Sequence, residues 1–335
     1  MTDTVTIQHG NGGREMHDLI HACIAPAIAN AHTRFPLDSA QINSGNLRCL
    51  FTTDSHVIDP LFFPGGDIGK LAVSGTANDI LVAGGKPCYM SLALILEEGF
   101  ALADLRRILQ SVREEADRAG VLVVTGYTKV VEKGKGDKVY INTACLGTPM
   151  FDPLPHFNRI ADGDRIIMTG SIADHGVAVM IQREGLTVEA DIRSDAAALS
   201  PVMDALSAQG VVPHFMTDPT RGGVAAACNE IVEATDLGIV LLQDKLVIQP
   251  QVDVVCELLG LDPLVIPSEG RAILIVAAED ADKTLTALRD VAMARDAAII
   301  GRVSKKQAKR VILETTAGTH VRVPMPYGVN LPRIC

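Results

Sequence analysis

Apolar and polar positions along the first half of the chain follow the two periods that distinguish strands from helices. Runs rich in Val, Ile, Leu and Thr are typical of strands, and an apolar residue every three to four positions is typical of an amphipathic helix. The predicted strands are residues 47–54, 89–97, 121–131 and 139–147, and the predicted helices follow residues 9–16, lie within residues 60–87 and span residues 102–119. This alternation predicts an α/β or α+β layer domain.

The second half repeats this pattern after a proline-rich stretch at residues 149–155. The predicted strands are residues 164–169, the start of 214–234, the segment after Glu269, 298–303 and 311–314, and the predicted helices are residues 177–183, 200–208, the end of 214–234, 252–259 and 280–294. Because prolines interrupt regular structure, we place the boundary between an N-terminal domain (41–150) and a C-terminal domain (151–322) at this stretch. A Gly-rich loop and a helix (1–40) precede them.

The last thirteen residues, 323–335, read VPMPYGVNLPRIC. Three prolines each remove a backbone donor and Gly328 frees the chain between them, so the pattern predicts neither a helix nor a central strand but an extended arm. Such an arm reaches about 43 to 47 Å. The thiol of Cys335 could therefore visit a pocket on its own subunit or on a partner. The alternative is a frayed terminus that ends in cysteine.

The composition is that of an ordinary soluble globular protein, with 335 residues of which 47% are hydrophobic and 21% are charged. This length suggests two domains with ample core. Because 40 acidic residues outnumber 30 basic ones, the net charge is −10 and the pI is near 5.4, which argues against a general binder of nucleic acid or anionic membranes. Neither a signal sequence nor an apolar run of the roughly 18 residues that span a bilayer is evident, so we expect a cytoplasmic protein.

The seven cysteines are widely scattered and form no CxxC pair. This spacing argues against a disulfide framework and against a structural zinc site. Six of the cysteines lie in apolar surroundings and are expected to be buried. Only Cys335 lies in a segment predicted to be mobile and exposed, where a thiol can react.

Two glycine-containing loops are candidates for anion binding. In HGNGGREM (residues 9–16), Gly12 and Gly13 come just before a predicted helix, where backbone amides can approach an anion at the positive end of the helix. A plain loop with an N-terminal cap is the alternative.

The second loop precedes the helix that ends at residue 234. Asp218, Thr220 and Arg221 come before Gly222 and the helix start, which is the geometry expected for phosphate or metal–phosphate binding. Arginine supplies a planar fork of donors suited to phosphate. A capping loop with a surface arginine is the alternative.

Carboxylates mark the first predicted strand and the helix after it. Asp54 ends the strand, and Asn78 and Asp79 lie inside an otherwise apolar helix rich in small residues. A polar pair buried in such a helix is costly unless a partner such as a metal ion satisfies it. A solvated polar face is the alternative.

Four segments carry a family resemblance: TTDSHVIDPLFFPGGDIGKLAVSGTAND (52–79), TKVV (128–131), TRGG (220–223) and the terminal PRIC. Together they resemble the HypE family, the carbamoyl dehydratases of NiFe-hydrogenase maturation, which belongs to the AIR synthase-like (PurM-like) ATP-binding superfamily. The similarity runs nearly from end to end, and FFPGG with PRIC is its specific part.

The resemblance implies a two-domain PurM-like fold, in which a mixed α/β domain is followed by an α+β domain. It also implies a homodimer whose first domains pair into a barrel-like sheet, with ATP and Mg²⁺ in the cleft between domains. Members of the family receive a carbamoyl group on the C-terminal cysteine from the carbamoyltransferase HypF. They dehydrate this group with ATP to a thiocyanate and pass the cyanide to iron on a HypC–HypD complex.

The same resemblance implies roles for individual residues. Asp54 and Asp79 match the carboxylates that hold Mg²⁺, and Cys335 matches the carrier of the carbamoyl group. Lys129 and Glu269 match a polar pair around this group, where either one would assist deprotonation if burial tunes its pKa. The positions near the nucleotide are Lys70, Asn78, Asp218, Thr220 and Arg221, together with the loop glycines Gly12, Gly13 and Gly222.

One position departs from the family pattern. Where the family usually has aspartate in GDTKVV, this chain has Tyr127, and a neutral phenol is a poor Mg²⁺ ligand compared with a carboxylate. Water or a neighbouring carboxylate such as Asp67 could substitute for the missing group, or activity is reduced. The alternatives in function are therefore a non-catalytic ATP-binding or docking member of the family, or another AIR synthase-like ATP-dependent enzyme such as selenophosphate synthetase or thiamine-monophosphate kinase.

Overall fold

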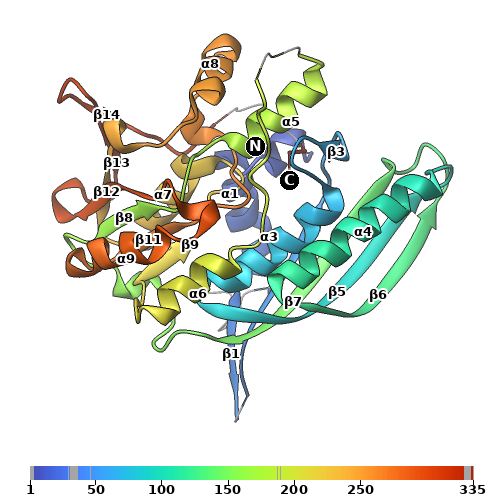
Figure 1. Ribbon diagram of the computed structural model, residues 1–335, viewed down its shortest axis with the longest axis horizontal. Helices are drawn as coiled ribbons and strands as arrows, with labels where there is room; N and C mark the ends of the chain where they lie inside the picture. The colour runs from blue at the N-terminus through green and yellow to red at the C-terminus, as the bar shows by residue number, and fades with distance from the viewer. Residues whose placement is uncertain are drawn as a thin grey trace.

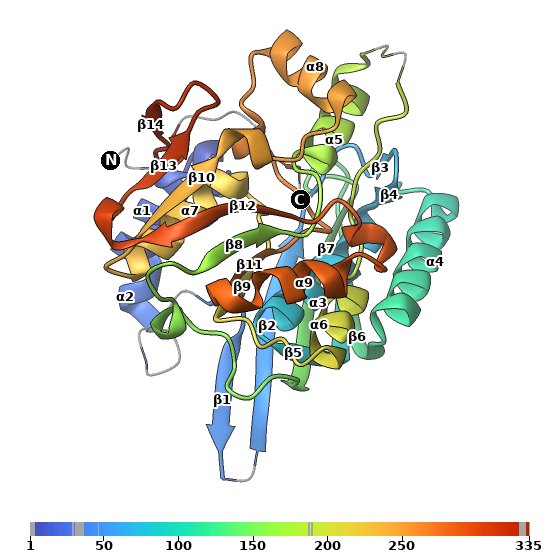
Figure 2. The same ribbon diagram turned by 60° about the vertical axis from the view of Figure 1, so that its left-hand side comes forward.

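Two mixed sheets form the framework of the computed structural model, which describes residues 4–28, 30, 37–45, 47–186, 188, 190–327 and 333–334 (Figure 1). The strands of the first sheet are, in spatial order, β1 (Ala40–Ser44), β2 (Leu47–His56), β7 (Val139–Pro149), β5 (Gly85–Glu97) and β6 (Leu122–Val131). Only β5 and β6 run parallel, and the other neighbours are antiparallel. The β1–β2 hairpin extends away from the body of the molecule (Figures 1 and 2).

Two helices cover one face of this sheet: α3 (Ile68–Val82) and α4 (Leu102–Ala119). Asp67 caps α3, because its Oδ1 accepts hydrogen bonds from the backbone N–H groups of Gly69 and Lys70. Nearly the whole of α3 is buried, since it is enclosed by the first sheet on one side and the C-terminal domain on the other. Its small residues are what permit this close packing.

The second sheet contains seven strands. In spatial order they are β14 (His320–Arg322), β13 (Val311–Glu314), β10 (Gly238–Leu242), β12 (Ala298–Ser304), β8 (Arg165–Met168), β11 (Ile273–Val276) and β9 (Phe215–Thr217). β10 and β13 are parallel, and the other neighbouring pairs are antiparallel.

Helices lie on both faces of the second sheet (Figure 2). Alternate residues of β8 enter different cores: Ile166 packs with residues of α7 (Gly223–Ala234), whereas Ile167 packs with residues of α6 (Ser200–Ala208) and α9 (Ala281–Leu288). A strand covered on both faces is apolar at every position, which explains the short continuous apolar runs in this half of the sequence.

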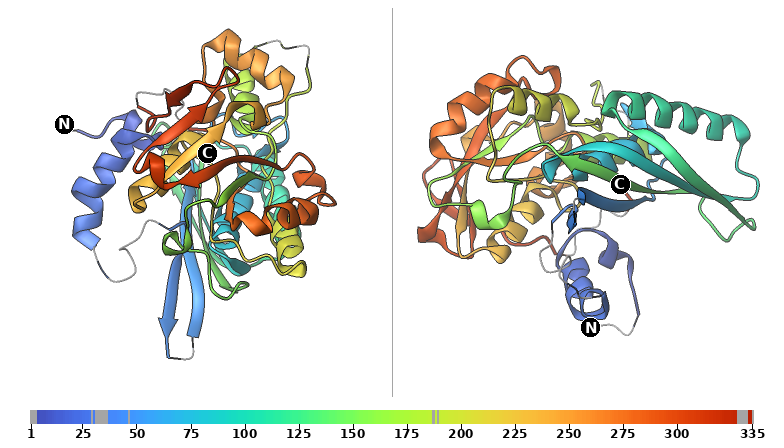
Figure 3. Two further views of the ribbon diagram at one scale, coloured as in Figure 1. Left: turned by 90° about the vertical axis from the view of Figure 1, so that its left-hand side faces the viewer. Right: turned by 90° about the horizontal axis from the view of Figure 1, so that it is seen from below.

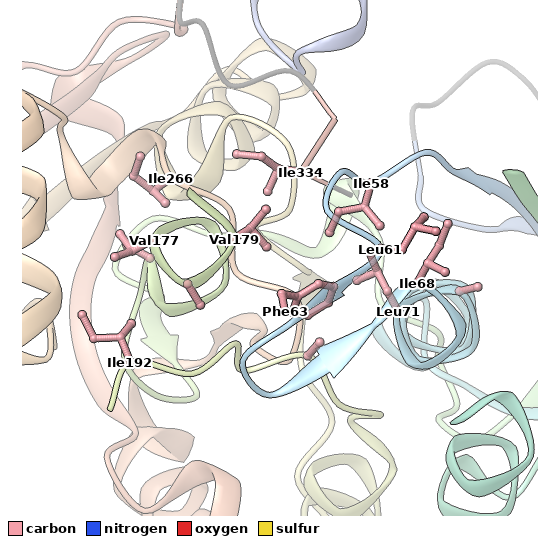
Figure 4. Close-up of a cluster of buried hydrophobic side chains, with 14 of the residues drawn as sticks. Ile58, Leu61, Phe63, Ile68, Leu71, Val177, Val179, Ile192, Ile266 and Ile334 are labelled. Carbon is pink, nitrogen blue, oxygen red and sulfur yellow. The ribbon is translucent and has the colours of Figure 1, made fainter. Parts of the chain in front are cut away.

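A third apolar core joins the two halves of the molecule. It includes residues that precede and begin α3, residues of α5 (Asp174–Glu184) and α8 (Pro250–Leu259), and Ile334 from the end of the chain. Figure 4 shows Ile334 beside Ile58, Val179 and Ile266. The C-terminal segment is therefore part of the interdomain core.

The first helical segment lies on the outside of the molecule (Figure 3). It consists of α1 (Arg14–Leu19), a π-helical turn (Ile20–Ile24) and α2 (Ala25–Ile28). Cys23 is exposed on it, and Cys49 and Cys88 are half-buried, so the prediction that six cysteines are buried is wrong for these three. Cys49 and Cys88 lie on β2 and β5 of the first sheet, and Cys23 lies on the outer helical segment. Cys145, Cys228 and Cys256 are buried as predicted.

Most predicted elements are present, but some of the short strands were missed. The sequence analysis did not predict β1, β10, β14 or the small hairpin of β3 (Phe62–Phe63) and β4 (Gly66–Asp67). The predicted helix over 280–294 is shorter, because α9 ends at Leu288 in a turn where the N–H of Val291 donates to the carbonyl of Leu288. Among the described residues, no helix combines the length and the apolar character that crossing a membrane requires.

The C-terminal arm has neither helix nor strand over its described residues, 323–327 and 333–334, as predicted. However, Val323, Met325 and Ile334 are buried, so these parts are not the exposed segment that the sequence suggested. These apolar side chains attach the described parts of the arm to the body. Cys335, Pro332 and Gly328 lie outside the described residues.

Candidate active site between the two domains

A cavity of about 280 Å³ lies where the two domains meet the N-terminal segment and the C-terminal arm. Residues from β2, from α3, from the loop before α7 and from residues 265–269 line it. Nine predicted site residues line this cavity or the smaller one beside it, namely Gly12, Gly13, Asp54, Asp79, Asp218, Thr220, Arg221, Gly222 and Glu269. Their functional roles stay predictions.

The floor of the cavity is acidic. Carboxylate oxygens of Asp38, Asp79 and Asp218 lie within 4.8 Å of one another, and Asp54 lines the same cavity. Burial, followed by the charges of Asp218 and Asp38, raises the pKa of Asp79 well above its usual value. Burial and then the charge of Asp38 raise the pKa of Asp218 in the same way, and burial and the charge of Glu230 raise that of Asp38 to about 7.

Local hydrogen bonds hold two of these aspartates in place, Asp79 by its carboxylate and backbone and Asp38 by its backbone. The hydroxyl of Thr52 on β2 donates to Oδ2 of Asp79 (2.8 Å) and lies within hydrogen-bond distance of the carbonyl of Asp38 (3.0 Å). Ser39 Oγ donates to the carbonyl of Asp79 (2.9 Å). The polar position inside α3 is therefore neither solvated on a free surface nor unsatisfied.

This donor set fits a divalent cation. Carboxylates crowded in a buried site repel one another, which a cation would relieve, and oxygen ligands are those that Mg²⁺ prefers. Asp218 was predicted near the nucleotide, but the structure places it in the acidic cluster itself. Asp38 was missed, because it follows no strand or helix signal in the sequence.

The glycines of the two predicted anion-binding loops permit a close approach of three segments. A Cβ on Gly12 would lie 2.3 Å from Cβ of Arg221, and one on Gly13 would lie 2.6 Å from the carbonyl oxygen of Pro326. Gly222 has φ of 78° and is followed at once by α7. The N-terminal loop, the start of α7 and the arm therefore meet at the cavity wall.

Two titratable side chains face each other across Gly75 of α3. A Cβ at Gly75 would lie 3.2 Å from the ring of His56 and 4.0 Å from Oε2 of Glu269. Glu269 is 2% exposed, and its Oε1 accepts no hydrogen bond from any described residue. Burial, followed by the charge of Asp218, raises its pKa well above the usual value. Its carboxylate is therefore more basic than that of a free glutamate.

Sequence reasoning missed His56, although a signal was present. Thr52, Asp54 and His56 alternate along β2, and this period places all three on one face of the strand. Nε2 of His56 lies 3.6 Å from Oδ2 of Asp54. Burial lowers the pKa of His56 in spite of this neighbour, which favours the neutral ring.

Two residues predicted near the nucleotide have other partners. Asn78 is buried, and its side chain joins the domains by donating to the carbonyls of Ala197 and Glu269 and accepting from the N–H of Leu199. Lys70 donates to the carbonyl of Gly65 (3.0 Å). Neither lines the cavity.

Lys129 does not line the cavity of its own chain either. It lies on the exposed strand β6, with Nζ 5.0 Å from the ring centroid of Tyr127. Tyr127 is exposed on the same strand and is absent from the cavity lining. The substitution of tyrosine for aspartate therefore leaves the acidic cluster of this chain unchanged.

The two described residues at the end of the chain line the cavity opposite the carboxylates. They are Arg333 and Ile334. Arg333 forms an ion pair with Asp137 of the first domain and donates from Nε to the carbonyl of Val57 (3.3 Å). Arg333, two residues before the predicted carrier Cys335, is thus fixed at the site.

Comparisons with known proteins show the family of this chain. Models of the AIR synthase related protein match the chain over residues 37–148 (N-terminal domain) and 161–314 (C-terminal domain). A carbamoyl dehydratase HypE from Azotobacter vinelandii is 46% identical over 334 residues, which cover 99% of this chain and 97% of the relative. The chain belongs to the HypE family.

Solved HypE structures share the fold. A chain of a HypE–HypF complex is 39% identical with a TM-score of 0.87, covering 92% of this chain and 99% of that chain. A HypE in complex with ATP is 39% identical with a TM-score of 0.83, covering 99% of this chain and 100% of that chain. The predicted two-domain PurM-like fold is confirmed.

Proposed function

We propose that this protein is a carbamoyl dehydratase that uses ATP to convert an S-carbamoyl group on Cys335 into a thiocyanate. The observation that carries the proposal is the position of the chain end: Arg333 and Ile334 line the same cavity as the acidic cluster and Glu269. Its relatives carry the name carbamoyl dehydratase, and one HypE structure contains ATP.

Cys335 is the thiol best suited to carry the group. Burial raises the pKa of Cys145 and of Cys228 to about 12 and that of Cys256 to about 11, so these three are unreactive thiols. Exposed or half-buried thiols elsewhere lie outside the cavity lining. Only the terminal cysteine follows directly on residues that line it.

The chemistry requires a nucleotide because an amide oxygen is a poor leaving group. Transfer of the γ-phosphoryl group of ATP to the carbamoyl oxygen forms a P–O bond and releases ADP. Loss of the two protons from nitrogen and cleavage of the C–O bond then give S–C≡N and inorganic phosphate. Water must be excluded, since it would hydrolyse the activated group.

The acidic cluster would hold Mg²⁺, which when bound neutralises charge on the phosphates of the nucleotide. Asp38, Asp79 and Asp218 supply the oxygen ligands, and Asp54 lies beside them. The start of α7 after Thr220 and Arg221 presents backbone N–H groups and a guanidinium for the phosphates. These residues orient the nucleotide toward the chain end.

Glu269 is suited to remove a proton from the carbamoyl nitrogen. Burial makes its carboxylate more basic, and a general base works best when its pKa approaches the operating pH. Asn78 fixes it, because the side-chain amide donates to the Glu269 carbonyl (3.0 Å). Asp195 also accepts from the Glu269 N–H (3.1 Å), so the base is held at both backbone groups.

We infer a homodimer that covers β6. All residues of this strand except Val131 are exposed, and the most exposed of its aliphatic side chains are Leu122, Val124 and Val130. An exposed apolar edge strand of this length is a surface that proteins normally pair or cover. Pairing there would place Lys129 at the interface, from which it would serve the partner's site. HypF would load Cys335, and a HypC–HypD complex would accept the cyanide.

Intact mass spectrometry tests the reaction. The protein is incubated with HypF and carbamoyl phosphate, then repurified and given Mg-ATP. We expect the C-terminal peptide to gain the mass of HNCO and then to lose the mass of one water. Cys335→Ala should bind nucleotide as the unaltered protein does and show neither change. A gain without the later loss would mean that the arm is loaded beside a site that does not turn over, and dehydration would be refuted.

A further inference from the structure

His175, on the first turn of α5, binds the C-terminal segment from inside the protein. The imidazole is fully buried. Nε2 lies 2.7 Å from the carbonyl oxygen of Ile334, and Nδ1 lies 2.8 Å from the hydroxyl of Ser194. The ring of Phe63 packs against the imidazole edge to face, with centroids 5.4 Å apart. None of these contacts belongs to the acidic cluster.

The partners of the imidazole determine which nitrogen carries the proton. A carbonyl oxygen can only accept, so Nε2 must be the donor to Ile334. Burial lowers the pKa of His175, which favours a neutral ring with Nδ1 as acceptor. Ser194 Oγ already accepts from the N–H of Ala196 (3.0 Å), so its own proton is available for Nδ1. Three hydrogen bonds therefore follow one another: Ala196 donates to Ser194, Ser194 donates to His175, and His175 donates to the carbonyl of Ile334.

We propose that His175 is a positioning residue that holds the C-terminal segment against the cavity through the carbonyl of Ile334, with Ser194 fixing the required tautomer. We call the hydrogen bond from His175 to Ile334, together with the bond from Ser194 that supports it, the latch. The effect of the latch on catalysis rests on the proposed function, whereas its effect on the position of the C-terminal segment does not.

A second contact holds the neighbouring carbonyl. The carbonyl of Arg333 accepts from Nη2 of Arg183 (2.6 Å) and from the N–H of Asp59 (3.2 Å). Arg333 itself has φ of 58°, a conformation that a non-glycine residue keeps only when surrounding contacts impose it. Two successive carbonyls are thus bound. Arg183 binds the carbonyl of Arg333, and His175 binds that of Ile334.

The latch should affect loading of Cys335 and dehydration in opposite ways. Loading of Cys335 by a transferase needs the segment released, whereas dehydration needs it bound beside the carboxylates. Weakening the contact at Ile334 therefore favours release. It should slow the step inside the cavity while leaving loading unchanged or faster.

Limited trypsin digestion measures the latch without any catalysis. Trypsin cuts after Arg333 only when that carbonyl is free, so release of the Ile334–Cys335 dipeptide, followed by intact mass, reports the open state. His175→Leu removes the donor, whereas His175→Gln retains an N–H near the position of Nε2. We expect His175→Leu to raise the cleavage rate about tenfold and His175→Gln to restore it to near the unaltered rate.

Two further variants make the test decisive. His320→Leu, at an exposed histidine on β14, should not change the cleavage rate. Ser194→Ala keeps the imidazole but removes the hydroxyl that fixes its tautomer, so it should raise the rate of cleavage by a smaller factor than His175→Leu. It replaces His175→Leu in the test if that variant does not fold. If trypsin cleaves His175→Leu, or Ser194→Ala where that variant replaces it, at the same rate as the unaltered protein, the latch is overturned.

Single-turnover dehydration of carbamoylated protein then separates the two proposals. With a functional latch we expect slower dehydration in His175→Leu, at unchanged affinity for Mg-ATP, and recovery in His175→Gln. If the unaltered protein dehydrates nothing while cleavage still responds to His175, the proposed function fails and the latch stands. Dehydration that is equally fast in His175→Leu would overturn the positioning role.

Discussion

The cavity and strand β6 carry two parts of the predicted chemistry and are built in opposite ways. In the cavity, the side chain of Asp79 accepts a hydrogen bond from Thr52, and the buried Glu269 is held through its backbone carbonyl by Asn78. On β6, apolar side chains stand in water beside Tyr127 and Lys129, and Val124 is 58% exposed. The described residues of one chain line the cavity, whereas the side chains of β6 project from the surface of that chain.

The buried carboxylates of the cavity and the exposed apolar side chains of β6 are suited to bind different kinds of partner. Crowded, buried carboxylates gain stability from a cation, which is a small ligand. An exposed apolar strand gains stability from another protein surface. The predicted base and the predicted lysine therefore depend on different binding events, although the sequence analysis placed them together.

Removing a carboxylate from the acidic cluster should have the largest effect. Asp79→Asn leaves the hydrogen bond from Thr52 possible but removes a charge from the cation site, so we expect thiocyanate formation to fall at least about 100-fold. The affinity for Mg-ATP, measured by calorimetry, should fall with it. Asp236→Asn, at a fully exposed aspartate, is the matched control. Full activity in Asp79→Asn would remove this residue from the site.

Much of the fold follows from the sequence because its long elements have clear periods. The helix over 102–119 is amphipathic and ends at Gly120, whose φ is 70°, and the structure gives the same bounds. The short strands β1 and β14 are not recognisable in this way. Each is short and is stabilised by antiparallel pairing with a neighbouring strand, β2 for β1 and β13 for β14, rather than by a hydrophobic period of its own.

The candidate site was predictable only where motifs mark it. The glycines, Asp54, Asp79 and Glu269 come from recognisable segments and lie at the cavities. Asp38 reaches the cluster from a segment with no signal, and Asn78 turned out to join the domains. Which side of a buried polar pair faces a ligand depends on tertiary packing, and the sequence period does not contain that information.

Placing a charge on β6 should have the second-largest effect. Val124→Glu buries an unpaired carboxylate if the strand is covered in a dimer, so we expect the dimer dissociation constant to rise at least about 30-fold. Light scattering with dilution measures it. Val321→Glu, at a similarly exposed valine on β14, is the control and should not change the oligomeric state. A Val124→Glu protein that stays dimeric at the same concentrations would place the interface elsewhere.

The smallest effect should be a dependence of stability on pH that arises in the cavity and not on β6. Burial raises the pKa of Asp38 and of Glu230 to about 7, above the values near 4 of an unfolded chain. Between about pH 4 and pH 7, these two carboxyl groups bind protons in the folded protein that they have released in the unfolded chain. The free energy of unfolding therefore falls as pH rises through this window, and the stabilisation is lost above the folded pKa values. Without divalent cations, we expect Tm to be about 5 °C higher at pH 6 than at pH 8. Differential scanning calorimetry should show a smaller difference for Asp38→Asn and an unchanged one for Val124→Glu, because Val124 lies outside the cavity. A higher Tm at pH 8 in the cation-free protein would mean that the carboxylates are not protonated in the folded state.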